Sequence, residues 1–127
     1  MRFRTKRHLV LLNNLAHLEV PGYRAQDLNV KAFQQMLSEA IQDRAEGRTS
    51  TLVLGSTDGF EASPAGTFRP VAEEVLEGPV RHDGNTVGLE RQMSKLMKNA
   101  MHIRVLSQLV DRSYRSLEEA WRGRTRG

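Results

Sequence analysis

The chain of 127 residues contains no cysteine and few aromatic residues. The lack of cysteine excludes disulfide bonds, thiol catalysis and thiolate metal ligands from this sequence. Hydrophobic residues make up 39% of the chain and aromatic residues 6%, so we expect a small core that is completed by contacts with partners. The longest purely apolar run, residues 9–12, is far shorter than the roughly 20 residues that span a bilayer.

The basic N-terminus is not followed by an apolar segment of signal-peptide length. A cleavable secretory signal would need such a segment and a small-residue cleavage site after it. We therefore expect either a cytoplasmic protein or one exported by a route that reads no cleavable signal.

Motifs for catalysis or cofactor binding are also missing. The chain has no glycine-rich phosphate loop, and its four histidines lack the spacing of a metal site. Asp83-Gly84-Asn85 resembles the start of a calcium loop, but Ser94 stands where the twelfth position requires a carboxylate. The sequence predicts a non-enzymatic protein with no cofactor, no metal and no small-molecule substrate.

The net charge of +4 is unevenly distributed. Residues 1–24 carry a net charge of +4, residues 25–85 of −5 and residues 86–127 of +5. The basic ends are typical of solvated helical faces. They do not favour a nucleic-acid interface, because almost no aromatic residues interleave with the basic ones. A third interpretation is that basic surface on one subunit meets acidic surface on another.

Residues 85–122 are predicted to form one helix about 57 Å long at 1.5 Å per residue. A compact chain of this length would be only about 36 Å across, so we expect an elongated molecule. Asn85 or Thr86 is the predicted N-cap. An apolar stripe at coiled-coil spacing, interrupted only by Ser107, requires a second helix from this chain or a neighbour. The stripe comprises Leu89, Met93, Leu96, Ala100, Ile103, Ser107, Val110, Tyr114, Leu117 and Trp121.

The rest of the chain divides into five segments, and the whole chain, residues 1–127, is predicted to form one domain. An N-terminal helix occupies residues 1–18, and a turn follows over residues 19–28, where Pro21 disfavours helix at Val20 and Gly22 permits a positive φ. A second helix covers residues 29–47 and ends at Gly47. An irregular insert with one β-hairpin spans residues 48–84, with strand-like segments at 51–54, 66–69 and 71–75. Residues 123–127 form a tail.

Two segments resemble one protein family. Residues 14–28, Asn-Leu-Ala-His-Leu-Glu-Val-Pro-Gly-Tyr-Arg-Ala-Gln-Asp-Leu, resemble the Asn-Ile-Ala-Asn…Thr-Pro-Gly-Tyr-Lys-Ala-x-Asp signature of bacterial flagellar rod and hook proteins. Residues 83–87 and 89–93 are similar to the segment that opens the last helix of short proximal rod proteins. The resemblance covers residues 7–31 and 80–123. His17 replaces the second Asn of the signature, and Val20 replaces the Thr.

The resemblance implies a mainly α, elongated fold in which the N- and C-terminal helices pair as a coiled coil around an irregular insert. It implies that Leu9, Leu12 and Leu15 pair with the C-terminal stripe, and that Pro21, Gly22 and Tyr23 fix the exit from the first helix, with Tyr23 at a subunit boundary. The implied function is that of a structural rod subunit, a drive shaft linking motor to hook that is needed for motility.

The implied partners are other rod proteins, basal-body and export-gate components and further copies of the chain, in a helical assembly without nucleic acid. The implied location is the periplasmic rod, reached through the flagellar type III system without a cleaved signal. Two alternatives remain open on the residues alone. A basic nucleic-acid-binding module would lose affinity steeply with salt, whereas a helical adaptor or chaperone would form a discrete dimer.

Overall fold

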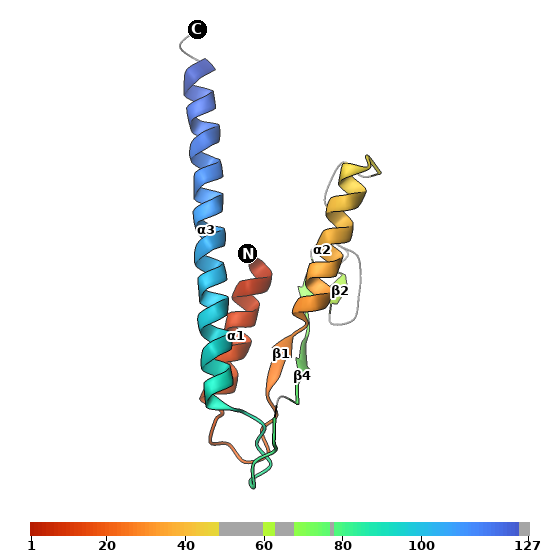
Figure 1. Ribbon diagram of the computed structural model, residues 1–127, viewed down its shortest axis with the longest axis vertical. Helices are drawn as coiled ribbons and strands as arrows, with labels where there is room; N and C mark the ends of the chain where they lie inside the picture. The colour runs from red at the N-terminus through yellow and green to blue at the C-terminus, as the bar shows by residue number, and fades with distance from the viewer. Residues whose placement is uncertain (49–59, 63–67, 77, 125–127) are drawn as a thin grey trace.

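The computed structural model describes residues 1–48, 60–62, 68–76 and 78–124. Figure 1 shows an elongated molecule in which the longest helix runs most of the height of the structure. No helix among the described residues is long and apolar enough to cross a membrane. The elements in chain order are α1 (Arg2–Ala16), β1 (Gln26–Leu28), α2 (Val30–Ala45), β2 (Phe60–Ala62), β3 (Phe68–Pro70), β4 (Ala72–Glu74) and α3 (Leu89–Arg124).

α1 and the start of α3 lie side by side near one end of the molecule, and α2 stands apart from them beyond β1 and β4 (Figure 1). α1 lies antiparallel against the first half of α3, and α2 leans away on the far side of α1 (Figure 1). The 36 residues of α3 correspond to about 54 Å, whereas the 15 residues of α1 correspond to about 22 Å. The predicted fold class is confirmed: the chain is mainly helical, its terminal helices are in contact, and a small antiparallel hairpin lies between them.

The strands form two ladders where the sequence predicted one hairpin. β2 pairs with β3 as a hairpin, while β4 pairs with β1 in the register Gln26↔Glu74 and Leu28↔Ala72. Residues 26–28 were expected to belong to a turn. Local sequence pattern does not predict this strand, because its partner β4 is distant in sequence. The predicted strand at 66–69 overlaps β3, the one at 71–75 overlaps β4, and the segment 51–54 lies outside the described residues.

Local signals explain where α2 begins and ends. The Asn29 side chain accepts a hydrogen bond from the Ala32 amide at 3.0 Å and so caps the helix N-terminus. Gly47 follows the helix with a φ of +71°, a conformation that glycine adopts without steric cost. The helix therefore falls within the range 29–47 that the sequence predicts.

The hydrophobic core joins the start of α1 to α2 and the strands. Phe3 is 1% exposed and clusters with Leu28, Met36 and Phe60. Its ring stacks on that of Phe33, with centroids 4.2 Å apart and planes 2° from parallel. The carbonyl oxygen of Arg4, in the same turn of α1, accepts a hydrogen bond from Asn99 of α3. This turn therefore connects the hydrophobic core to α3.

Replacing Phe3 by alanine should lower the free energy of unfolding by about 3–5 kcal/mol, because a stacked aromatic ring is lost from a filled core. Urea unfolding followed by circular dichroism measures this change. The matched control is Leu9→Ala on the same helix. Leu9 is 58% exposed, so its loss should change stability by no more than about 0.5 kcal/mol. Equal effects of the two substitutions would contradict this core assignment.

Candidate assembly interface

Asn85 connects the end of α1 to the segment that leads into α3. Its side chain is fully buried, and its Nδ2 donates to the carbonyl oxygens of His17, Leu18 and Val20 at 3.1, 3.1 and 2.8 Å. Its Oδ1 accepts from the Val87 amide at 2.7 Å. One amide side chain thus bonds to four backbone groups. We call the region where residues 14–26 lie against residues 83–92 the joint.

The prediction that Asn85 or Thr86 caps the last helix is wrong. α3 begins at Leu89, and the Gly88 carbonyl accepts the bond from the Gln92 amide at 3.0 Å. The side chains of Asn85 and Thr86 are occupied elsewhere: Thr86 Oγ1 accepts from the Ala25 amide at 2.8 Å. Their polar groups hold the joint together instead of serving the helix amides.

The predicted Pro-Gly-Tyr turn lies directly against the segment before α3. Gly22 has a φ of +72°, and its amide donates to the Asp83 carbonyl at 2.9 Å, while the Thr86 amide donates to the Tyr23 carbonyl at 3.1 Å. Pro21 is exposed on the outside of the turn. The turn therefore brings together the two segments on which the family resemblance rests.

Tyr23 is half-buried and makes its contacts within the chain. Its ring stacks on His17 with centroids 4.6 Å apart. Its hydroxyl donates to Asn14 Oδ1 at 3.2 Å and accepts from Asn13 Nδ2 at 3.1 Å. Histidine at position 17, where the family signature has Asn, thus contributes an aromatic face to the joint.

Buried polar side chains lie in the seam between α1 and α3. Asn14, with no exposed area, donates to the Gln26 carbonyl at 2.6 Å and to Gln92 Oε1 at 3.2 Å, and its Oδ1 accepts from the Gln26 amide at 3.0 Å. Farther along, the buried Asn99 donates to the Arg4 carbonyl at 2.9 Å. The hydrogen bonds of Asn14 fix the register of the two helices, because breaking them would leave buried polar groups unsatisfied. Asn99 contributes only its amide nitrogen, since its Oδ1 is buried without a hydrogen-bond partner among the described residues.

The predicted pairing of Leu9, Leu12 and Leu15 with the stripe of α3 is wrong within the chain. Leu9 and Leu12 are exposed and Leu15 is half-buried. Along the stripe, Leu96 and Ile103 are partly buried, but most other members point to solvent. Heptad spacing reveals an apolar face, but it does not reveal which side of the helix the partner covers. The exposed members of the stripe are Leu89, Met93, Ala100, Ser107, Val110, Tyr114, Leu117 and Trp121.

Asp27 joins three elements at one carboxylate, although sequence reasoning did not single it out. Its Oδ1 is 2.7 Å from Arg7 Nε on α1, and its Oδ2 is 2.7 Å from Lys95 Nζ on α3. Burial alone would raise the pKa of the Asp27 carboxyl, but the hydrogen bonds and positive charges of Arg7 and Lys95 outweigh it and lower that pKa below its ordinary value. Asp27 is the aspartate of the Ala-x-Asp part of the family signature, and this match was the sequence signal that could have indicated it.

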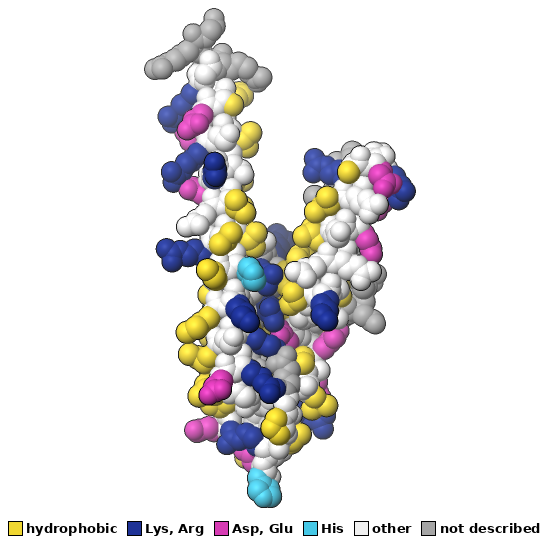
Figure 2. Space-filling model, in the orientation of Figure 1, with side chains coloured by type: hydrophobic (Ala, Val, Ile, Leu, Met, Phe, Trp, Pro, Cys, Tyr) yellow, Lys and Arg dark blue, Asp and Glu magenta, His cyan; other side chains and the backbone are white. Residues whose placement is uncertain are grey.

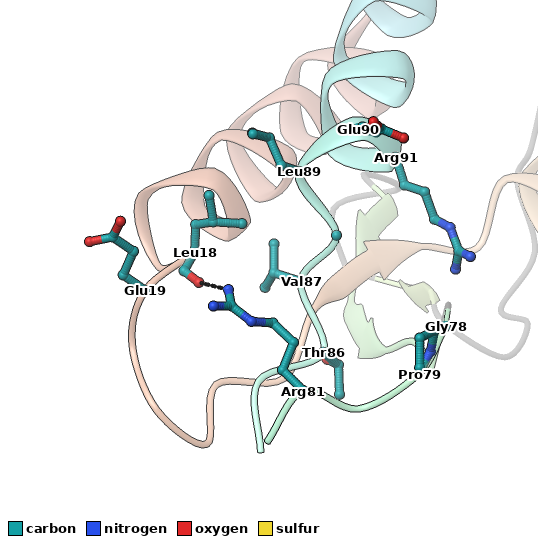
Figure 3. A pocket seen from close by; sticks show the side chains of 11 residues that line it. Leu18, Glu19, Gly78, Pro79, Arg81, Thr86, Val87, Leu89, Glu90 and Arg91 are labelled. Carbon is teal, nitrogen blue, oxygen red and sulfur yellow. Dashed lines mark hydrogen bonds between the residues drawn. The ribbon is translucent and has the colours of Figure 1, made fainter. Parts of the chain in front are cut away.

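An open cleft of about 670 Å³ lies where α3 begins. Figure 3 shows Arg81 reaching the Leu18 carbonyl, a 3.2 Å hydrogen bond, while Glu19 and Glu90 lie on opposite sides of the cleft. Acid and base side chains therefore do not converge here. Across the described residues, no group of three His, Asp or Glu side chains could hold a metal ion.

The second half of α3 carries a shallow apolar groove of about 380 Å³, which we call the distal groove. Figure 2 shows hydrophobic side chains running up α3 beyond the part that α1 covers. The opposite side of the same stretch carries Gln108, Arg112, Arg115 and Glu119, all exposed. Apolar surface gathered on one side of an otherwise polar helix marks an interface with another protein. The groove is lined by Leu106, Leu109, Val110, Ser113, Tyr114 and Leu117.

Replacing Asn85 by alanine should destabilise the fold by about 2 kcal/mol, because buried carbonyls and the Val87 amide lose their partners. Asn85→Asp should be more damaging still, since it places a negative charge against three carbonyl oxygens. Chemical denaturation measures both. Asn13→Ala, which removes one exposed hydrogen bond, is the control and should be nearly neutral. A harmless Asn85→Asp would contradict the role of this amide as a donor.

Replacing Asp27 by asparagine should cost about 3 kcal/mol near neutral pH, because Arg7 and Lys95 lose their counter-charge. A carboxyl whose pKa is lower in the folded than in the unfolded chain stabilises the fold above its unfolded pKa of about 3.9. That contribution disappears as the pH falls through the folded pKa. Unfolding measured from pH 7 down to pH 2 should therefore show the difference between the two proteins shrinking below about pH 4. A difference that is constant across this range would refute the assignment.

Comparison with known proteins identifies relatives that cover most of the chain. It is 27% identical over 120 residues to the flagellar basal body rod protein FlgB of Aeromonas hydrophila, covering 94% of this chain and 85% of the relative. It is 29% identical over 103 residues to FlgB of Escherichia coli strain K12 and 28% identical over 104 residues to FlgB of Yersinia enterocolitica. Both alignments cover 80% of this chain and 72% of the relative.

No family model matches the chain. The relatives agree with the resemblance of residues 14–28 and 83–93, the two segments that Asn85, Gly22 and Thr86 join. Over most of its length the chain is similar to flagellar basal body rod proteins named FlgB.

Proposed function

We propose that the chain is a structural subunit of the flagellar basal-body rod, forming part of the drive shaft between motor and hook through self- and hetero-assembly of its helices. The relatives are named as rod proteins, which supports the structural role. The observation that supports assembly through helices is the exposed apolar side of α3, which extends beyond the N-terminal end of α1 (Figure 2).

The energetic support is the size of this exposed apolar surface. Val110, Tyr114, Leu117 and Trp121 are each between 44% and 69% exposed. Full burial of one such side chain is worth about 1.5–3 kcal/mol relative to leaving it in water. Because each of the four is only about half exposed, their burial by neighbouring subunits would contribute about 3–6 kcal/mol in total, which is comparable with the lower end of the stability of a small domain, about 5–15 kcal/mol.

The joint around Asn85 and Asn14 supports a mechanical role. It connects α1, β1 and α3 through buried hydrogen bonds and the Asp27 ion pairs. Packed and fully bonded elements transmit strain instead of absorbing it. A shaft subunit needs this property, because torque must pass from one copy to the next without bending the subunit.

The proposed partners are other rod proteins, basal-body and export-gate components and further copies of the chain. Different surface patches in contact with one another generate open helical assemblies, which suits a rod. The proposed location is the periplasmic rod, with export through the flagellar type III system without a cleaved signal. We infer no enzymatic activity, in keeping with the structural role of the named relatives.

Introducing two aspartates in the distal groove, Val110→Asp with Leu117→Asp, should abolish both swimming and recovery of the chain in purified basal bodies. Both residues are exposed in the single chain, so the variant should still fold and be expressed. Motility agar, immunoblots of basal bodies and circular dichroism measure these outcomes.

The matched control places the same two aspartates on the polar side of the same turns, Gln108→Asp with Arg112→Asp. This control should assemble more completely and swim faster than the groove variant. If the native chain is not recovered in basal bodies, the proposed function is wrong. If the groove variant assembles normally, the assembly mechanism is wrong.

A further inference from the structure

The open cleft at the start of α3, which we call the joint cleft, is lined only by interior segments of the chain. Its volume is about 670 Å³, and its lining residues all lie between positions 18 and 91. Pockets that bind small ligands measure about 300–1,000 Å³. The cleft therefore suits a few residues of an extended segment better than it suits a helix, which is about 10–12 Å across.

Apolar side chains form the floor of the joint cleft. Val87 is 3% exposed, and Leu18 and Pro79 lie on either side of it (Figure 3). Leu89, at the start of α3, is 49% exposed. Apolar side chains of a bound segment would leave water on contact with this floor, which is favourable.

Arg91 places a cation in the wall of the joint cleft. A Cβ atom at Gly78 would lie 2.5 Å from Arg91 Nη1, so the glycine leaves the room in which the guanidinium packs against the backbone. Arg91 is exposed, and it forms no ion pair with a described residue. Its charge is therefore held in place by packing and is free to bind an anion.

Arg81 supplies a second cation. Its Nη1 donates to the Leu18 carbonyl at 3.2 Å, and its Nη2 is 3.9 Å from Asp83 Oδ2. An ion pair this long and this exposed contributes little. Figure 3 shows the carboxylates of Glu19 and Glu90 away from the apolar floor, whereas the guanidinium of Arg81 lies beside it. The interior of the cleft is therefore positively charged.

The charges of the chain favour another protein as the source of the matching carboxylates. Two copies repel each other through a net charge of +4 on each. Three exposed carboxylates, those of Asp43, Glu46 and Glu74, already pair with arginines of the same chain. A second copy that offered one of them would lose that pair, whereas an acidic partner would bring carboxylates without this loss.

We propose that the joint cleft binds an extended, acidic segment of a different basal-body protein, whose carboxylates bond to Arg81 and Arg91 and whose apolar side chains contact the floor around Val87. Guanidinium groups bind carboxylates through paired hydrogen bonds, which gives such a contact direction as well as strength. This inference rests on the proposed function and adds the location and the chemistry of one contact.

Site-specific photo-crosslinking in motile cells tests the contact. A benzophenone amino acid replaces Glu19 or Val80, which are both exposed, so that the probe leaves the interior of the cleft free. Crosslinked peptides from purified basal bodies are identified by mass spectrometry. Both positions should reach one acidic segment of a different protein.

Crosslinks to a second copy, within the chain or to a segment without acidic residues would overturn the proposal. The same holds if neither position crosslinks in a chain that is present in basal bodies, although the proposed function would then stand. Absence of the native chain from basal bodies would instead contradict the proposed function.

Removing one charge tests the chemistry of the contact. Arg91→Gln should lower the crosslinking yield severalfold, and Arg91→Lys, which keeps the charge, should lower it less. Lys98→Gln is the matched control, because Lys98 lies seven residues after Arg91, about two turns farther along the same side of α3, and does not line the cleft. Equal yields from Arg91→Gln and Lys98→Gln would exclude Arg91 as a binding residue.

Gly78→Ala tests the position of Arg91 while both arginines remain. The new Cβ would displace the guanidinium, so the yield should again fall severalfold. Because Gly78 has a φ of +157°, urea unfolding is measured on the same variant, and Arg91→Gln provides the test in an unaltered backbone. An unchanged yield in Gly78→Ala would show that packing against Gly78 does not position Arg91 for binding.

Discussion

The buried amide side chains at the base of the molecule are the constraint on which the rest of the structure depends. Asn85 satisfies three carbonyls at the end of α1, and Asn14 bonds both to the backbone of β1 and to Gln92 of α3. Each of these groups would carry a desolvation cost of about 1–3 kcal/mol if it were buried without a partner. The network therefore specifies one arrangement of the elements, because other registers would leave several such groups unsatisfied.

The polar contacts between α1 and α3 leave much apolar surface of both helices exposed. Part of the contact between α1 and α3 is made by the buried amides of Asn14, Gln92 and Asn99, and many apolar residues of both helices lie outside it. Leu9 and Leu12 on α1, and most of the stripe on α3, remain exposed. The chain is thus held together by hydrogen bonds as well as by its small core, and much of its hydrophobic surface stays exposed.

Hydrophobic periodicity predicted the existence and approximate extent of the helices. The three–four spacing predicted a C-terminal helix over residues 85–122, and α3 covers Leu89–Arg124. The same spacing did not identify which part of the stripe is covered within the chain, because the second half of α3 extends beyond α1 (Figure 1). Asn29 acts as a cap, as its position before an amphipathic run suggests, whereas Asn85 in a similar position does not. The difference lies in what surrounds each side chain: carbonyls from residues 17–20 are within reach of Asn85 alone.

The sequence by itself determined that the chain is elongated, mainly helical and free of cysteine, because helix length and composition are local properties. It also carried the two segments that indicate the family. Only the tertiary structure decided that β4 pairs with β1, that Asp27 joins Arg7 and Lys95, and which side of α3 faces α1. These features depend on partners far apart in the chain, whose distances and hydrogen-bond geometry have no local signature in the order of residues.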